Sequence, residues 1–148
     1  MITTRETIYQ ALFELVSAAP GIVYASRVFK LFNDVPPERM PALFQVQNGE
    51  RAEQTRGLPT KWRMEATLWL YVQQNEDDTV PASATLNPLI DYIVGALGAP
   101  LNATPENVQT LGGLVHRAWV SGDANIETFE GFFQNVTVAT IPVLILTA

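Results

Sequence analysis

The chain has 148 residues, of which 47% are apolar, so it is long enough for one globular domain with a substantial core. It has no cysteine and a single histidine, His116, which excludes disulfides, a thiol nucleophile and any metal site built from cysteines or several histidines. Its formal net charge of -6 argues against general nucleic-acid binding, because neutralising phosphates requires a basic surface.

The charges are unevenly distributed along the chain. Residues 1–74 carry eight basic and seven acidic side chains, a net of +1, whereas residues 75–148 carry one basic and eight acidic side chains, a net of -7. This split either serves solvation alone or gives the molecule a positive and a negative side. In the second case, copies of the chain could pair head-to-tail.

No targeting or membrane segment is predicted. The first six residues lack the basic-then-apolar order of a signal peptide. The longest apolar run, residues 141–146, is far shorter than the roughly 20 residues that a membrane helix needs. We therefore expect a soluble protein that is made in a cytoplasm and binds no membrane.

The first predicted element is a helix that begins at Thr3. Thr3 and Glu6 have the spacing of a capping box, and apolar residues repeat on one face as far as Val16. Pro20 and Gly21 end this helix, because proline cannot continue the hydrogen-bond ladder and glycine tolerates the turn.

Short extended segments follow the first helix. Residues 22–24 and 28–32 are β-like, and residues 33–38, with two adjacent prolines, are typical of a turn. Residues 43–47 alternate between apolar and other side chains and predict a strand. Residues 48–59 are polar and rich in charge, so we expect a long exposed loop there.

The clearest strand covers residues 62–72. One face is apolar throughout, whereas the other carries Arg63, Glu65, Thr67, Trp69 and Tyr71. A surface loop that contains Glu76 and Asp77 follows over residues 73–81.

A second helix is predicted over residues 85–97. Thr85 can cap it, Pro88 falls in its first turn, and Gly98 ends it. Residues 114–121 and 136–147 then predict strands. Because Pro142 has no N–H to donate, the last strand should lie at an edge of the sheet or be bulged there.

The order of these elements predicts the α+β class. We expect two main helices packed on a mostly antiparallel sheet, with residues 1–148 forming a single domain.

The sequence offers little for catalysis. His116 lies in a predicted strand without a second histidine, the pair at residues 112–113 is not part of a phosphate-binding loop, and the acidic run at residues 76–78 lacks the spaced ligands of a calcium loop. We predict no enzyme, no cofactor and no metal. A small-molecule-binding domain or hydrolase that uses His116 with Asp91 or Glu127 remains an alternative.

Features of an interaction protein are stronger. Trp69 and Tyr71 share the face opposite the apolar one, so this face is either covered by a helix or forms an aromatic interface. The loop over residues 48–59, which contains Arg51 and Arg56, is longer than a hairpin needs and could grip a neighbouring molecule. The candidate interaction residues are Arg51, Arg56, Lys61, Trp69, Tyr71, Glu76 and Asp77.

Several stretches together resemble the tail-terminator, or tail-completion, proteins of long-tailed bacteriophages and prophages. They are RGLPTKW at residues 56–62 continuing into EATLWLYV at 65–72, LNPLID at 86–91, TLGGLVH at 110–116 and ATIPV at 139–143. With the opening helix and the DVPP turn at 34–37, the resemblance spans nearly the whole chain, and the order and spacing of the stretches carry it.

The resemblance implies a structural virion protein of the tail or neck, assembled in the host cytoplasm. Such α+β proteins form a homo-oligomeric ring, usually a hexamer, on the finished tail tube, where they stop tube growth and provide the tail-to-head joining surface. The implied partners are the tail-tube protein and head-tail connector proteins, and DNA passes through the lumen without specific binding. An acidic lumen would repel the phosphates of the passing DNA.

The resemblance further implies that the loop over residues 48–59 is a contact arm and that the protein has no catalytic residue or cofactor. The alternative within the same class is another head-tail connector or a neck or tail-tube subunit. For a ring, we expect salt to weaken assembly, and we expect reversal of Arg51 and Arg56 to weaken it more than reversal of Glu76 or Asp77.

Overall fold

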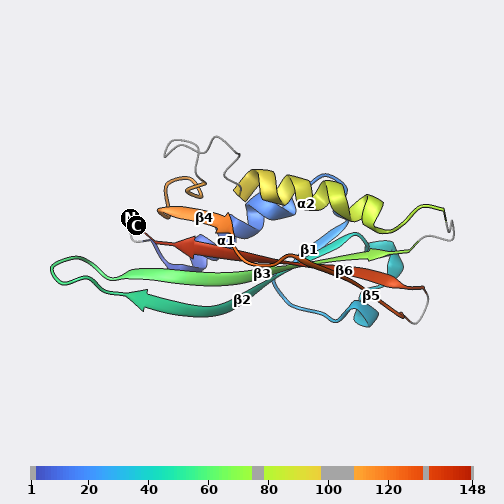
Figure 1. Ribbon diagram of the computed structural model, residues 1–148, viewed down its shortest axis with the longest axis horizontal. Coiled ribbons are helices and arrows are strands. Elements are labelled where there is room, and N and C mark those ends of the chain that lie inside the picture. Colours follow the sequence, from blue (N-terminus) through green and yellow to red (C-terminus); the bar gives the residue numbers. More distant parts are fainter. Residues whose placement is uncertain (1–2, 75–78, 98–108, 132–133, 148) are drawn as a thin grey trace.

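The computed structural model describes residues 3–74, 79–97, 109–131 and 134–147 (Figure 1). The helices and strands in chain order are α1 (Arg5–Ser17), β1 (Tyr24–Ser26), β2 (Ala42–Glu53), β3 (Lys61–Gln73), α2 (Ser83–Leu97), β4 (Arg117–Val120), β5 (Asn125–Phe129) and β6 (Val136–Leu146). Two single 3-10 turns, η1 (Phe32–Asp34) and η2 (Pro37–Arg39), lie between β1 and β2. The predicted α+β class, with two helices on a mostly antiparallel sheet, is confirmed.

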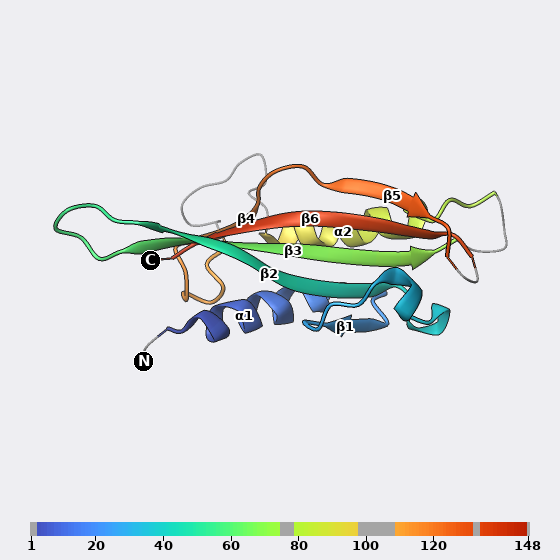
Figure 2. The same cartoon turned by 90° about the horizontal axis from the view of Figure 1, so that it is seen from below.

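The strands form one sheet in the order β1-β2-β3-β6-β4, with β5 also paired to β6. β1 is parallel to β2, and all other pairs are antiparallel. β4 pairs with residues 143–146 of β6 and β5 with residues 136–140, so β4 and β5 occupy one edge of the sheet in succession. β1 lies at the opposite edge (Figure 2).

Both helices pack on one face of this sheet. The apolar stripes of α1 and α2 meet the alternate residues of β3 that point to that face, from Met64 to Val72, and the matching residues of β6. This is the arrangement expected when each helix has one apolar stripe and each strand alternates. Within the described residues, no helix is long and apolar enough to cross a membrane.

The helix ends differ from the expected ones by one or two residues. α1 is capped by Thr4, whose Oγ1 accepts a hydrogen bond from the Thr7 N–H at 3.2 Å, so the predicted cap at Thr3 is wrong. α2 begins at Ser83, which places Thr85 inside the helix and Pro88 in its second turn rather than its first. Gly98, the predicted end signal, lies outside the described residues.

In the described part of the chain, neither α1 nor α2 packs on the second face of the sheet, which carries a smaller apolar cluster. Phe44, Tyr71 and Val138 belong to this cluster, and the chain between β1 and β2 contributes Val35 to it. The predicted strand over residues 28–32 is wrong, because residues 28–31 have no regular secondary structure and Phe32 begins η1. The ring of Phe29 packs against Trp69 of β3 instead.

Half of the predicted loop over residues 48–59 is strand, because residues 48–53 belong to β2. β2 continues to Glu53 and pairs with β3 up to the Glu53–Lys61 pair, after an irregularity of register between Gln47 and Glu50. Only residues 54–60 form the turn. The two strands therefore make a long hairpin that projects past the ends of the other strands (Figure 1).

The predicted position of β6 at an edge is also wrong. β6 lies between β3 and the pair of short strands β4 and β5, with Pro142 opposite Thr67 of β3. The irregularity that proline requires is found in the neighbouring strands, because β4 ends at Val120 and β5 begins at Asn125.

Candidate interaction surface

The projecting part of the β2–β3 hairpin is the most distinctive surface of the molecule. We define the arm as residues 51–63, since Arg63 is the last residue of β3 in this direction that still pairs with β6. The arm contains four basic side chains and one acidic side chain, a net of +3. Leu58, in its turn, is 59% exposed. The arm is thus a cationic projection with an apolar residue near its tip.

Three of the predicted interaction residues share this arm. Arg51, Arg56 and Lys61 are exposed, and none of them has an ion pair within the part of the chain that the structure describes. The single acid of the arm, Glu53, binds Arg63 at 2.5 Å. Arg51, Arg56 and Lys61 are therefore available to an acidic partner, whereas Arg63 is paired.

Glu50 fastens the base of the arm to α1. Its carboxylate accepts hydrogen bonds from Arg5 Nε at 2.7 Å and from the Tyr9 hydroxyl at 3.3 Å. The Arg5 guanidinium also lies 4.6 Å from the ring centroid of Trp62 in the arm. Burial, and then the negative charge of Glu50, raise the pKa of the Tyr9 hydroxyl, so it stays a proton donor to that carboxylate. These contacts join the start of the arm to α1.

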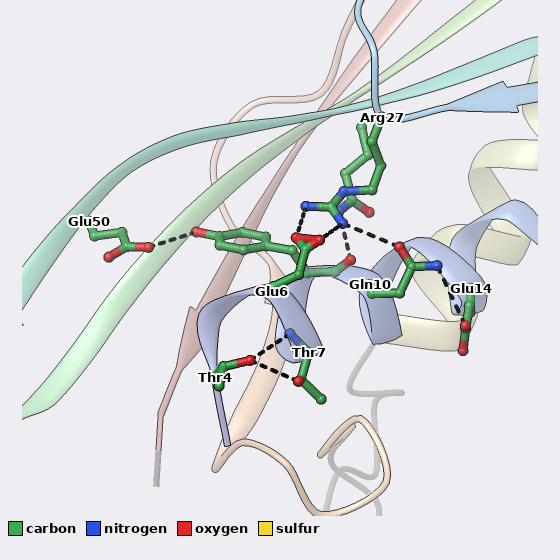
Figure 3. Close-up of polar contacts among 9 residues, drawn as sticks. Thr4, Glu6, Thr7, Gln10, Glu14, Arg27 and Glu50 are labelled. Atoms are coloured by element: carbon green, nitrogen blue, oxygen red, sulfur yellow. Dashed lines mark hydrogen bonds and ion pairs between the residues drawn. The ribbon is translucent and has the colours of Figure 1, made fainter. Parts of the chain in front are cut away.

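A second polar cluster ties α1 to the chain that follows β1 (Figure 3). Arg27 makes two hydrogen bonds to the carboxylate of Glu6, at 2.9 and 2.7 Å, and one to Gln10 Oε1 at 3.2 Å. The hydrogen bond from Arg27 lowers the pKa of Glu6. Arg27 is thus paired within the chain, unlike Arg51, Arg56 and Lys61 of the arm.

The two aromatic interaction candidates lie on the second face of the sheet. Tyr71 is only 1% exposed and its hydroxyl donates to the Lys30 carbonyl oxygen at 2.7 Å, so it has no surface to offer a partner. Burial raises the pKa of this hydroxyl to about 12. Trp69 is half-buried, with its ring centroid 5.1 Å from that of Phe29. Trp69 therefore keeps some exposed surface, whereas Tyr71 does not.

The acidic interaction candidates, Glu76 and Asp77, lie outside the described residues. The structure instead reveals an acidic edge that the sequence reasoning missed. Asp123, Glu127 and Glu130 flank or belong to β5, and residues 121–130 are all exposed. The signal available in the sequence was three acids without a basic residue between positions 121 and 131.

The geometry does not assemble the enzymatic alternative that pairs His116 with Glu127. The His116 N–H donates to the Leu146 carbonyl oxygen, whereas Glu127 is opposite Val138, eight residues away along β6, or roughly 26 Å. The His116 side chain itself is exposed. Among the described residues, no three acidic or histidine side chains are grouped as metal ligands.

A pocket of about 620 Å³ lies between the start of α1 and the base of the arm. Its charged lining residues are Arg5 and Glu6, which are already bound to Glu50 and Arg27. The pocket therefore presents no charged group that still needs a partner.

Comparison with known proteins gives little further guidance. No protein-family model matches the chain, and no curated protein matches it. Among solved structures, the chain is similar to one from a structure entitled "Virion of native gene transfer agent (GTA) particle", with a TM-score of 0.44 and 13% identity over 95% of this chain and 92% of that chain. A similarity at this level carries no information on function.

Proposed function

We propose that this chain is a structural protein of a bacteriophage or phage-like particle that caps the tail tube as an oligomeric ring. In this role it ends tail polymerisation and forms the surface to which the head joins. The observation that carries the proposal is the resemblance of the ordered stretches at residues 56–72, 86–91 and 110–116 to tail-terminator proteins.

The fold is consistent with this resemblance where the two can be compared. The α+β class that the resemblance implies is the observed class. The longest of the three stretches builds half of the arm and the length of β3, which lies inside the sheet between β2 and β6. The resemblance therefore includes the projecting element that is best suited to reach another molecule.

The charges of the arm suggest how such a cap would make contacts. Arg51, Arg56 and Lys61 are exposed cations at the end of a hairpin whose base is fixed by Glu50. A held projection loses less conformational freedom on binding than a free loop, so more of its interaction energy appears as affinity. We propose that the arm is a contact arm that engages an acidic surface of a neighbouring subunit or of the tail-tube end.

The proposal is tested by removing the protein from particles that contain it. We expect negative-stain microscopy to show tails of uncontrolled length without attached heads. Wild-type protein supplied in trans should restore uniform, joined tails. A variant with Arg51→Glu, Arg56→Glu and Lys61→Glu should restore fewer, while the charge-preserving variant Arg51→Lys with Arg56→Lys should act like the wild type.

Other outcomes would reject the terminator role in recognisable ways. Tails of normal length that lack heads would identify a head-tail connector instead. Complete loss of tail tubes would identify a tube subunit. Normal, joined tails in the absence of the protein would remove it from tail assembly altogether.

A further inference from the structure

The edge strands β1 and β5 are connected through the same series of cross-strand residue pairs. Following the paired residues across the sheet, Tyr24 of β1 leads through Ala42, Tyr71 and Val138 to Glu127 of β5. By the same route, Ser26 leads to Asn125. The edges are therefore on opposite sides of the molecule but at the same level along the strands (Figure 2).

The β5 edge is acidic and partly apolar. Asp123, Glu127 and Glu130 have no ion pair within the described part of the chain. Ile126 and Phe129 are 46% and 38% exposed. An exposed edge strand with free backbone groups is a template for pairing with another strand, and soluble proteins usually cover or blunt it.

The β1 edge has the complementary character. Lys30 and Arg39 lie over the ring of Tyr24, at 5.9 and 4.9 Å from its centroid, and neither has an ion pair among the residues described. Beside them, Val28 and Leu31 are 69% and 61% exposed. This edge therefore offers cations and apolar surface, where β5 offers carboxylates and apolar surface.

The strand directions and faces also match. Because β1 runs parallel to β2, and each following step across the sheet to β5 is antiparallel, β5 of one copy would run antiparallel to β1 of the next copy. Tyr24, with its two cations, packs with the cluster on the second face of the sheet, and Glu127 lines a pocket with Trp69 on that same face. Opposite charges would thus meet on one side of a joined sheet.

We propose that the β1 edge of one copy docks on the β5 edge of a second copy and extends the sheet from subunit to subunit. The interface is heterologous, so it leaves one edge free on each terminal copy until the assembly closes. Because both edges lie at the same level, copies joined in this register add without a shift along the strands. A ring, unlike a helix, has no rise per subunit along its axis, so this placement permits closure when the strands run along that axis. Only the role of this ring as a tail cap rests on the proposed function.

A charge-swap experiment tests the pairing on the purified chain. One variant carries Lys30→Glu and Arg39→Glu, and the other carries Glu127→Lys and Glu130→Lys. Each alone should associate at least roughly tenfold more weakly than the wild type in sedimentation, which corresponds to a loss of about 1.4 kcal/mol. An equimolar mixture should restore assembly, because each interface then joins opposite charges. Circular dichroism and thermal melting verify that both variants are folded.

Cysteine cross-linking tests the same contact without requiring a stable assembly. The chain has no cysteine, so Ser26→Cys with Asn125→Cys places the only two thiols on the two edges. Oxidation of the concentrated protein should give a ladder of covalent oligomers. The control pair, Ser26→Cys with Asp91→Cys on the exposed side of α2, should give at most dimers from random collision.

The outcomes separate this inference from the proposed function. A ladder no stronger than the control, or unaltered association of both charge variants, overturns the edge-to-edge contact. Reversal of the arm charges could abolish association while the edge variants behave as wild type. In that case the arm makes the contacts between subunits, and the β1–β5 contact is rejected. A clear ladder in the cross-linking experiment supports the β1–β5 contact. If particles that lack the protein nevertheless have normal, joined tails, the contact stands and the role as a tail cap is rejected.

Discussion

Pro142 lies within the inner strand β6 without interrupting the sheet. The N–H that proline lacks would face the connection between β4 and β5, where no strand pairs with β6. The Pro142 carbonyl oxygen accepts a hydrogen bond from the Ser121 N–H at 3.1 Å, so it points toward the β4–β5 edge. The N and C=O of one strand residue point to the same side, and the missing donor therefore faces the connection between β4 and β5. In that connection Gly122 adopts a φ of +111°, which side-chain-bearing residues rarely adopt, and a Cβ there would come within 3.2 Å of the Pro142 ring.

The Tyr71 hydroxyl makes stability sensitive to alkaline pH. Burial raises its pKa from 10.0 to about 12, so the folded chain holds this proton more tightly than the unfolded chain does. The contribution of Tyr71 is therefore complete below pH 10 and is lost as the pH rises toward 12. We expect the melting temperature to fall over this interval.

The variant Tyr71→Phe isolates this effect. At neutral pH it should be less stable by about 1 kcal/mol, because the hydrogen bond to the Lys30 carbonyl is lost. Between pH 10 and 12 its melting temperature should decline less steeply than that of the wild type. Tyr92→Phe, which removes a half-buried hydroxyl from α2, provides the control. Equal slopes for Tyr71→Phe and the wild type would contradict the assignment.

At the scale of elements, the sequence predicts those strands that bury one face against the helices. β3 was predicted within a residue at each end, because its apolar residues alternate toward the helices from Met64 to Val72. The part of the arm that belongs to β2 was not predicted as strand, because neither of its faces is buried and the apolar alternation disappears there. β5 was not predicted as a strand, because all five of its residues are exposed and show no apolar alternation.

The interaction role of Arg51, Arg56 and Lys61 stays a prediction. The sequence could place these three residues near one another, because they are close together in the chain and share one hairpin. The complementary edges could not be predicted, because Tyr24 and Glu127 are related only through three other residues of the sheet, Ala42, Tyr71 and Val138. No local sequence pattern indicates that these two residues lie at the same level of the sheet.

Glu50 joins the base of the arm to α1, and we expect it to anchor the arm. Glu50→Ala deletes the acceptor of both Arg5 and the Tyr9 hydroxyl, which should cost about 1–2 kcal/mol, or roughly 2–6 °C in melting temperature. Amide hydrogen exchange should become faster across the arm while β6 stays protected. Glu53→Ala, which breaks only the exposed contact with Arg63 inside the arm, should change stability by less than about 0.5 kcal/mol. Equal effects of the two variants would show that Glu50 is not an anchor.

At the scale of the whole molecule, the net charge of -6 conceals a separation of charge in space. The arm and the β1 edge hold cations without ion pairs in the described chain, whereas the β5 edge holds three carboxylates without a basic neighbour between residues 121 and 131. Copies that repel one another at long range through their net charge can thus attract one another where opposite edges meet.

This separation predicts how assembly responds to salt. Raising the ionic strength from about 0.1 to 1 M shortens the screening length from about 10 to about 3 Å, so contacts between exposed charges weaken. We expect light scattering to show smaller assemblies at high salt. The response should flatten in a variant with Glu127→Gln and Glu130→Gln, whose β5 edge keeps only the carboxylate of Asp123. The apolar contribution of Ile126 and Phe129 should grow with salt instead, so Ile126→Ser should weaken assembly at every salt concentration. Assembly that is indifferent to salt and to the glutamine variant, but lost in Ile126→Ser, would leave an apolar edge contact and remove the electrostatic one.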